Sequence, residues 1–251
     1  MPPLPTPVPT PTPTKKRWWR RWWGILVLAV FAVITLFFLY VGYLVIRTVV
    51  APLPQDQAQN TKRFTVSSEG GEASRVDKSR LVRDTSASLG SPNAPVQIVE
   101  FVDFECPYCL ESYPIIRSLA AEYGERIHYV FRHYPVPQLH ERAEDTALAV
   151  LCAAKQEKFW PYHDRLFQNQ AQLSDDDLRV FAESVGLNLS LFDECRRSSE
   201  TREDLKRDVA DGTALGVRGT PTWFINGTKV EGAIPEDIFR KVIDELLKQA
   251  E

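Results

Sequence analysis

Two cysteines separated by two residues, in Cys106-Pro107-Tyr108-Cys109, are the residues of this chain whose spacing points most directly to chemistry. They follow an apolar run, residues 96–104, that is typical of a buried strand. A helix beginning at the first cysteine would place its sulfur beside unpaired backbone N–H groups, which stabilise a thiolate. Pro107 suits the first helical position because it has no N–H to leave unpaired. We therefore predict a redox-active pair, with Cys106 as the nucleophile and Cys109, one turn further on, as the resolving thiol.

Half of a zinc site and a purely structural disulfide are the alternatives for this pair. Zinc usually takes four ligands, often from a second close cysteine pair, and this chain has none. The sequence therefore predicts no metal and no cofactor. The histidines lack ligand spacing and are interpreted as packing or surface residues: His128, His133, His140 and His163.

The elements that must position the cysteines follow the order of an α/β domain. The strand at 96–104 is followed by a helix over 107–123, in which Pro114 predicts a kink. Residues 127–132 alternate like a second strand. Because a helix separates the two strands, we expect them to be parallel.

A long helical block and a hairpin follow. Helices are expected over 141–156 and 158–168, from Ser174 to near Gly186, from Ser190 through Cys195, and over 200–215. Asn226-Gly227 then predicts a tight turn between strands at 222–225 and 228–230, and a final amphipathic helix opens at Pro235. The sequence thus predicts a mixed sheet with helices on both sides and a helical subdomain inserted at about 139–205.

The N-terminal part has a different composition. Residues 2–14 are a proline-rich tract that predicts an extended tail, either a spacer or a docking site for a proline-recognising domain. Residues 24–46 carry no charge and are long enough to span a bilayer, longer than the apolar region of a cleaved signal peptide. We expect a cytoplasmic tail at 1–23, a transmembrane anchor at 24–46, a flexible linker at 47–80, and a folded domain at 81–251. A buried helix of a soluble domain is the alternative for 24–46.

The charge distribution orients this arrangement. Five bases precede the apolar run and only Arg47 lies close behind it, so the positive-inside rule predicts a cytoplasmic N-terminus and an extracytoplasmic domain. All 33 acids follow residue 46. The acidic downstream part argues against a nucleic-acid partner. The five bases are Lys15, Lys16, Arg17, Arg20 and Arg21.

Three stretches carry a resemblance to a known family. They are residues 95–109 with the cysteine pair, residues 158–167, and residues 215–227 around Gly219-Thr220-Pro221-Thr222. From about residue 81 to 248 the chain resembles the DsbA-like thiol:disulfide oxidoreductases of the thioredoxin superfamily. The resemblance implies a thioredoxin-like fold with an inserted helical subdomain, here preceded by one predicted transmembrane helix.

The resemblance also implies roles at matching positions. Cys106 would be the exposed nucleophile and Cys109 the buried resolving thiol. Pro221 would be a cis-proline facing them, leaving the Thr220 backbone free to bind an extended substrate, with Pro107 and Tyr108 beside it. A trans proline at a strand start is the alternative.

Glu100 matches a buried acid of the family. A carboxylate within an apolar strand is costly unless it is neutral or paired, and near Cys109 it could carry protons to and from that thiol. The alternative is that Glu100 points to a wet edge of the sheet.

Two departures from the family pattern affect the expectations. Tyr108 stands where strongly oxidising members have a histidine that stabilises the thiolate, so the potential is expected to be less oxidising. Cys152 and Cys195, a pair found in only some relatives, are interpreted as a structural disulfide, with two buried free thiols as the alternative.

The resemblance implies an oxidoreductase that forms disulfides in exported cysteine-containing proteins by dithiol–disulfide exchange. A separate membrane partner, such as a quinone-linked oxidase, would reoxidise it. A reductase or isomerase of the same fold is one alternative. A non-catalytic extracellular binding module is another, which the intact cysteine pair beside Thr220-Pro221 disfavours.

Overall fold

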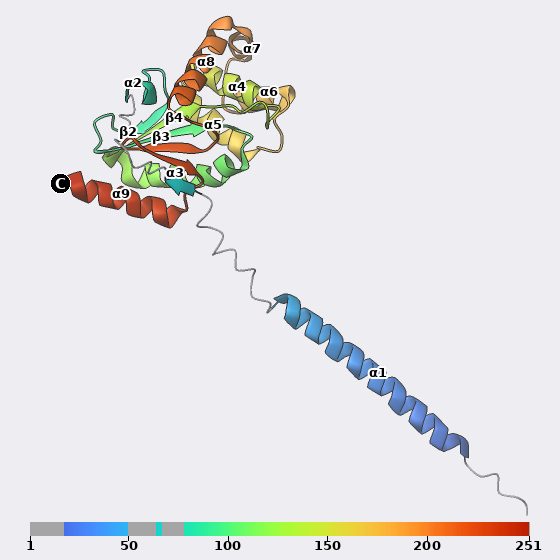
Figure 1. Cartoon of the computed structure of the whole chain (residues 1–251). Helices are drawn as coiled ribbons and strands as arrows, with labels where there is room; N and C mark the ends of the chain where they lie inside the picture. The colour runs from blue at the N-terminus through green and yellow to red at the C-terminus, as the bar shows by residue number, and fades with distance from the viewer. Residues whose placement is uncertain (1–17, 50–63, 67–77, 251) are drawn as a thin grey trace, which may run out of the picture. The chain divides into compact units, whose positions relative to one another are not determined.

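A computed structural model of the chain describes residues 18–49, 64–66 and 78–250 (Figure 1). The chain divides into two compact units, residues 1–58 and 59–251. The first unit contains helix α1 (Trp18–Val49), which extends beyond both ends of the predicted 24–46 segment. Among the residues that the structure describes, no helix is long and apolar enough to cross a membrane.

The second unit has the predicted α/β organisation. Its elements are β1 (Phe64–Val66), α2 (Lys78–Leu81), β2 (Ser88–Gly90), β3 (Val96–Val102), α3 (Pro107–Tyr123), a 3₁₀ helix (Gly124–Arg126), β4 (Ile127–His133), α4 (Ala143–Ala154), α5 (Phe159–Gln168), α6 (Asp175–Ser184), α7 (Leu189–Arg197), α8 (Ser199–Ala214), β5 (Thr222–Ile225), β6 (Thr228–Gly232) and α9 (Glu236–Ala250).

These strands form one mixed sheet in the order β1-β6-β5-β3-β4-β2. Strands β3 and β4 pair in parallel, as their connection through α3 requires, and Glu100 lies opposite Phe131. Strand β5 pairs antiparallel with both β3 and β6. Asn226 and Gly227 both have positive φ, 47° and 88°, which is the conformation of the predicted tight hairpin turn.

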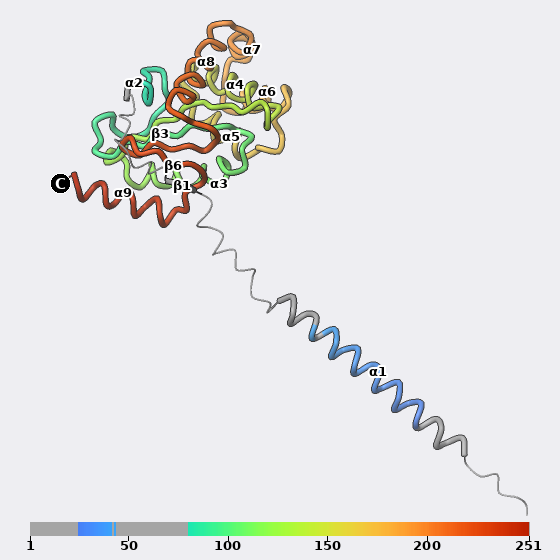
Figure 2. Tube along the Cα trace, viewed as in Figure 1, coloured from blue at the N-terminus to red at the C-terminus, as the bar shows by residue number. Residues whose placement is uncertain are grey.

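The sheet separates two layers of helices (Figures 1 and 2). Helices α3 and α9 pack on one face, where Ile116 and Phe239 join the strand residues Ile98 and Trp223 in a buried cluster. The other face buries Phe101 in a cluster with Val217, which lies in the segment after helix α8. Helices α4 to α8 stand between β4 and β5 in the chain and form the predicted insertion.

The predicted linker at 47–80 is wrong in part, because residues 64–66 form strand β1 on β6 and residues 78–81 form helix α2. Strand β2, which pairs antiparallel with β4, was not predicted either. Both strands are three residues long and lie at the sheet edges. Three residues are too few to show an alternation of apolar and polar side chains. These strands form because their backbones pair with the neighbouring strand, which a local pattern does not predict.

The helix boundaries are close to those predicted, with one cap misassigned. Ser174 caps α6 through a capping box with Asp177, as its sequence signature indicates. Helix α7 begins at Leu189, so Asn188 rather than Ser190 is its cap, and the Asn188 side chain accepts a hydrogen bond from the Leu191 amide. Asparagine and serine cap equally well, and the two residues are only two positions apart, so the sequence does not distinguish them. The first strand ends at Val102, two residues before the predicted end.

Candidate active site

Cys106 lies at the junction between strand β3 and helix α3. It is the N-cap of α3, with extended backbone angles, and Pro107 occupies the first turn. The Cys106 carbonyl accepts hydrogen bonds from the amides of Cys109 and Leu110, each at 3.1 Å. The strand therefore delivers the first cysteine to the helix N-terminus, where the dipole and the free amides favour a negative sulfur.

The two thiols have opposite electrostatic environments. The pKa of Cys106 is lowered to about 6, chiefly by a hydrogen bond from the Cys109 thiol and further by contacts with Thr220 and the first-turn amides. Burial raises the pKa of Cys109 well above its usual value, and a negative Cys106 raises it further. Both cysteines are free thiols in this structure. Near neutral pH the pair therefore holds one thiolate, at Cys106.

The prediction that Cys106 is exposed is wrong for this structure. Cys106 is only 4% exposed, and Cys109 is 1% exposed. The Cys106 thiol lies 3.1 Å from the Thr220 carbonyl oxygen and donates a hydrogen bond to it, so this neighbouring segment covers the sulfur. The two cysteines differ in how well their thiolates are stabilised, and not in exposure. The residues between them are exposed: Tyr108 is 50% exposed and Pro107 is also exposed.

The structure brings Thr220 and Pro221 to the cysteines, and the peptide bond between them is cis. Pro221 is buried and Thr220 is half-buried. The Thr220 carbonyl, expected to be free for a substrate backbone, accepts a hydrogen bond from the Cys106 thiol while that thiol is protonated, and it loses this donor when Cys106 ionises. A substrate strand that used this carbonyl would therefore replace the Cys106 S–H as its donor.

Glu100 is buried, not at a wet edge: it is 3% exposed in the middle of β3. The Tyr129 hydroxyl donates a 2.6 Å hydrogen bond to Glu100 Oε2. Burial raises the pKa of Glu100 to about 8, although the Tyr129 hydrogen bond lowers it. The Glu100 charge acts on Cys109, so a carboxyl that is largely protonated at neutral pH lies within electrostatic range of the resolving thiol.

Three residues at the site had no role predicted from the sequence. The Asp103 carboxylate accepts hydrogen bonds from the amides of Glu105 and Val136, at 2.9 and 2.8 Å. The same carboxylate pairs with His140 Nδ1 at 2.8 Å. The Gln170 amide donates to the carbonyls of Phe104 and Cys106. Asp103 was part of the family-like stretch, but His140 and Gln170 reach the site across 37 and 64 positions, a separation that no local pattern encodes.

Cys152 and Cys195 form a disulfide that joins α4 to α7, with their Cα atoms 5.7 Å apart. This bond lies within the inserted helical block, where Cys195 Sγ is 3.4 Å from Thr201 Oγ1. His163 is buried and its Nδ1 lies 2.9 Å from Asp164 Oδ1.

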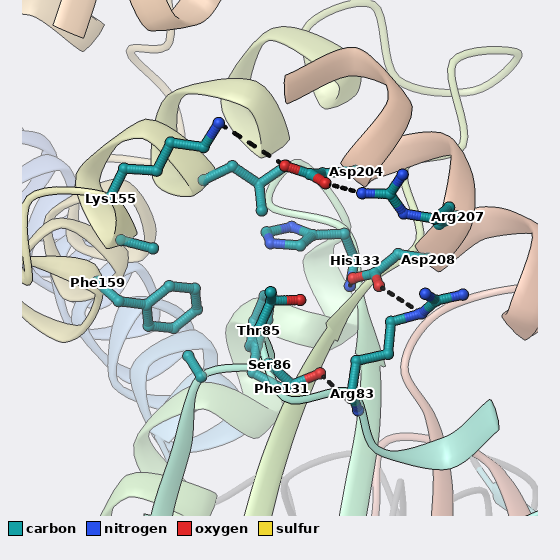
Figure 3. A pocket seen from close by; sticks show the side chains of 13 residues that line it. Arg83, Thr85, Ser86, Phe131, His133, Lys155, Phe159, Asp204, Arg207 and Asp208 are labelled. Atoms are coloured by element: carbon teal, nitrogen blue, oxygen red, sulfur yellow. Dashed lines mark hydrogen bonds and ion pairs between the residues drawn. The ribbon is translucent and has the colours of Figure 1, made fainter. Parts of the chain in front are cut away.

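A separate cavity of about 260 Å³ lies between β4, α4 and α8 (Figure 3). His133, Phe131 and Phe159 line it, and none of its lining residues is a cysteine. The cationic side chains that line the cavity pair with carboxylates that also line it. Lys155 lies 3.7 Å from Asp204, which also pairs with Arg207. Arg83 lies 4.0 Å from Asp208. Because the cations are already neutralised and the thiols are elsewhere, we assign this cavity no part in the dithiol chemistry.

A little over half of the chain is similar to part of two curated proteins. Curated relatives include the Na(+)/H(+) antiporter NhaA 3 of Salinispora tropica, 38% identical over 143 residues, and the Na(+)/H(+) antiporter NhaA 1 of Mycolicibacterium gilvum, 37% identical over 145 residues. Each match covers 57% of this chain but only 22% and 24% of the relative, so the chain spans less than a quarter of the length of these proteins.

Solved structures share the fold. A thioredoxin-like oxidoreductase from Silicibacter pomeroyi is 25% identical, with a TM-score of 0.60 over 66% of this chain and 94% of that one. The thiol-disulfide exchange protein alpha-DsbA2 of Wolbachia pipientis is 22% identical, with a TM-score of 0.63 over 75% of this chain and 98% of that one. The catalytic domain of Proteus mirabilis ScsC is 23% identical, with a TM-score of 0.61 over 70% and 97%.

These likenesses confirm the thioredoxin-like fold, and the structures that share it include proteins described as a thioredoxin-like oxidoreductase and a thiol-disulfide exchange protein. A family model described as thioredoxin matches residues 83–245, well over half of the chain and all of the site residues named above. The chain belongs to the thioredoxin family.

Proposed function

We propose that this protein is a membrane-tethered, extracytoplasmic thiol:disulfide oxidoreductase that forms disulfides in exported proteins. The observation that carries the proposal is the opposite perturbation of the two thiol pKa values, lowered at Cys106 and raised at Cys109. A stabilised Cys106 thiolate is a good leaving group, and it makes the reduced form of the dithiol the favoured one. Both properties favour transfer of a disulfide from the enzyme to its substrate.

In the first step, a substrate thiolate attacks the Cys106 sulfur of the oxidised enzyme. A mixed disulfide forms between the substrate and Cys106. The Cys106–Cys109 bond breaks, and the electron pair of that bond leaves with the Cys109 sulfur. Because burial raises the pKa of Cys109, this sulfur must take up a proton as it leaves. Glu100, with its pKa raised to about 8, carries a proton within the same buried region and is the proposed donor.

In the second step, another substrate thiolate attacks the substrate sulfur of the mixed disulfide. The substrate disulfide forms and Cys106 leaves as the stabilised thiolate. Two electrons have then passed from the substrate to the enzyme, which is left as the dithiol. The exposed Pro107 and Tyr108, with the Thr220–Pro221 segment, form the proposed contact surface for the substrate chain.

The membrane tether is proposed from the N-terminal part. Residues 24–46 are an uncharged apolar run, and large side chains of α1 from Ile25 to Tyr43 are exposed. Five preceding bases favour a cytoplasmic N-terminus, which puts the dithiol on the outer side. Similar stretches within proteins named as antiporters are consistent with work at a membrane. A separate membrane oxidase, such as a quinone-linked protein, is the proposed acceptor of the two electrons.

Trapping of mixed disulfides by a Cys109→Ala variant of the full chain tests this function. Without the resolving thiol, Cys106 keeps its partners as adducts that run at higher mass on non-reducing gels and disappear with reductant. We expect the adducts to be exported proteins and a membrane oxidase, in a fraction that resists alkaline extraction. Cys106→Ala/Cys109→Ala is the matched control and should give no adducts. Adducts with cytoplasmic proteins alone would contradict both the orientation and the function.

The direction of electron flow is tested separately, with the purified wild-type protein. Oxidation of a reduced, unfolded substrate should be faster than reduction of insulin by the same protein. The reverse order would assign a reductase or isomerase instead, and the absence of both reactions would leave only a binding module.

A further inference from the structure

The Asp103 carboxylate ties the active-site turn to a loop distant in sequence. Its Oδ1 accepts the Glu105 amide, and its Oδ2 accepts the Val136 amide and contacts His140 Nδ1, all at 2.8–2.9 Å. Its backbone also belongs to the turn, since the Asp103 carbonyl accepts a hydrogen bond from the Cys106 amide. The loop between β4 and α4 is thereby fixed beside the first cysteine.

His140 is the basic partner of Asp103 in this arrangement, with Nδ1 2.8 Å from Asp103 Oδ2. Asp103 is 1% exposed, and a buried carboxylate is stable only with hydrogen bonds and a compensating charge. The charged groups acting on His140 are Asp103, Cys106 and Glu105, with Glu141 and Arg142 as its chain neighbours. Arg142 is itself paired with Asp145 and Asp175, at 2.7 and 2.9 Å.

The negative charges of Asp103, Cys106 and Glu105 all favour the protonated form of His140. Burial lowers the pKa of His140, but the Asp103 hydrogen bond and these three negative groups outweigh it, so the net direction is upward. Favourable interaction between two charges is reciprocal, so an imidazolium at His140 favours the Cys106 thiolate by the same free energy.

We propose that His140, clamped by Asp103, is a positioning residue whose imidazolium stabilises the Cys106 thiolate from outside the Cys106–Cys109 segment. Tyr108, between the cysteines, carries no positive charge, and His140 supplies one from the β4–α4 loop instead. When the Cys106–Cys109 disulfide is reduced, the Cys106 thiolate stabilises the His140 imidazolium. When the dithiol is oxidised, His140 loses one of its three anionic neighbours. This inference rests on the proposed thiol–disulfide function and adds to it the residue that tunes the nucleophile.

The alkylation rate of reduced Cys106 as a function of pH tests the proposal. His140→Gln keeps an amide donor for Asp103 but removes the charge. In the wild-type protein the rate should rise with a midpoint near pH 6. In His140→Gln the midpoint should move upward, so that alkylation at pH 5.5 is about 3- to 10-fold slower. The equilibrium constant with glutathione should shift by a similar factor towards the enzyme disulfide.

His128→Gln is the matched control. His128 is a histidine of β4 opposite Gln97 and Gly90, towards the far end of the sheet from the cysteines, and its replacement should leave the midpoint unchanged. A merely structural role for His140 would lower the melting temperature without moving the midpoint. An unchanged midpoint in a folded His140→Gln protein would overturn the proposal.

A second measurement needs no variant in the tested protein. The His140 ring resonance, assigned by through-bond correlation to its backbone in isotopically labelled wild-type protein, should titrate at higher pH in the reduced protein than in the oxidised one. Identical titration in both states would contradict the proposal even if the variant failed to fold. Neither readout requires substrate oxidation, so the coupling can be upheld in a protein that fails as an oxidase, or refuted in one that succeeds.

Discussion

The Tyr129 hydroxyl donates a 2.6 Å hydrogen bond to the Glu100 carboxyl across the parallel strands β3 and β4. Both side chains are buried, and burial is the main cause that raises the pKa of each. The pair lies within electrostatic range of Cys109. The Cys109 charge raises the pKa of Tyr129, and the Glu100 charge raises the pKa of Cys109. In the proposed mechanism, this pair is the source of the proton that the resolving thiol takes up.

Replacement of Glu100 by glutamine should slow the exchange step in which Cys109 leaves or attacks. The amide keeps an acceptor for Tyr129 but transfers no proton, so we expect at least about a 10-fold lower rate at pH 7. The wild-type rate of Cys109 departure should also fall as Glu100 ionises near pH 8, an inflection that the variant lacks. Stopped-flow fluorescence of a single exchange turnover would measure both effects.

Tyr129→Phe is the companion to that variant. The Tyr129 hydrogen bond lowers the pKa of Glu100, so its removal should move the inflection to higher pH while the carboxyl remains. If Glu100→Gln keeps both the wild-type rate and the inflection, Glu100 is not the proton carrier.

The reduced protein should become more stable as the pH rises from 6 to 9, relative to Cys106→Ser. The pKa of Cys106 is lowered from 9.0 to about 6 by folding, so its contribution is full above pH 9 and is lost as the pH falls through 6. The contribution is up to roughly 4 kcal/mol. Denaturant unfolding of both reduced proteins at several pH values would measure it.

Glu100 acts in the opposite direction, and most of its contribution cancels in that comparison because burial, its main cause, is common to both proteins. Its folded pKa of about 8 lies above its ordinary 4.5, so its contribution is present below pH 4.5 and is lost as the pH rises through 8. Both proteins retain Glu100, so their difference reports the thiolate together with the part of the Glu100 shift that the Cys106 charge causes. A stability difference that is flat between pH 6 and 9 would mean that Cys106 is not a low-pKa thiol.

Loss of the Cys152–Cys195 disulfide should destabilise the protein without removing its dithiol activity. The bond closes a loop with a sequence separation of 43, for which the chain-entropy treatment gives about 4 kcal/mol. Cys152→Ala/Cys195→Ala should therefore melt at a lower temperature while Cys106 keeps its alkylation profile. Free thiols at both positions in protein isolated from an oxidising compartment would refute the bond.

The sequence predicted those parts of the site that depend on local chemistry. Pro107 after Cys106 marked the start of α3, Asn226-Gly227 marked the β5–β6 turn, and the crossover helix required parallel β3 and β4. Each of these signals acts over a few residues and reflects one backbone constraint. The roles of Thr220 and Pro221 came from the family resemblance. The structure places the Thr220 carbonyl 3.1 Å from the Cys106 sulfur, and a cis peptide bond joins Thr220 to Pro221.

The remaining parts depend on contacts between distant segments. His140 meets Asp103 only because the β4–α4 loop returns over the β3–α3 turn, and Tyr129 meets Glu100 only because of the β3–β4 register. The burial of Cys106 likewise arises from the Thr220 segment, 114 positions away. Periodicity and capping signals carry no information on such pairings, which the packing of the whole domain determines.

The most direct test of the account is a single-turnover exchange between the oxidised full-length protein and a reduced peptide that contains two cysteines. Mass spectrometry should find one peptide disulfide formed for each protein dithiol, with a transient peptide adduct on Cys106 and none on Cys109. Cys106→Ser should form no peptide disulfide, and Cys152→Ala/Cys195→Ala should form it as the wild type does. Equal adducts on both active-site cysteines, or peptide oxidation by Cys106→Ser, would contradict the central claim that Cys106 is the exchanging nucleophile.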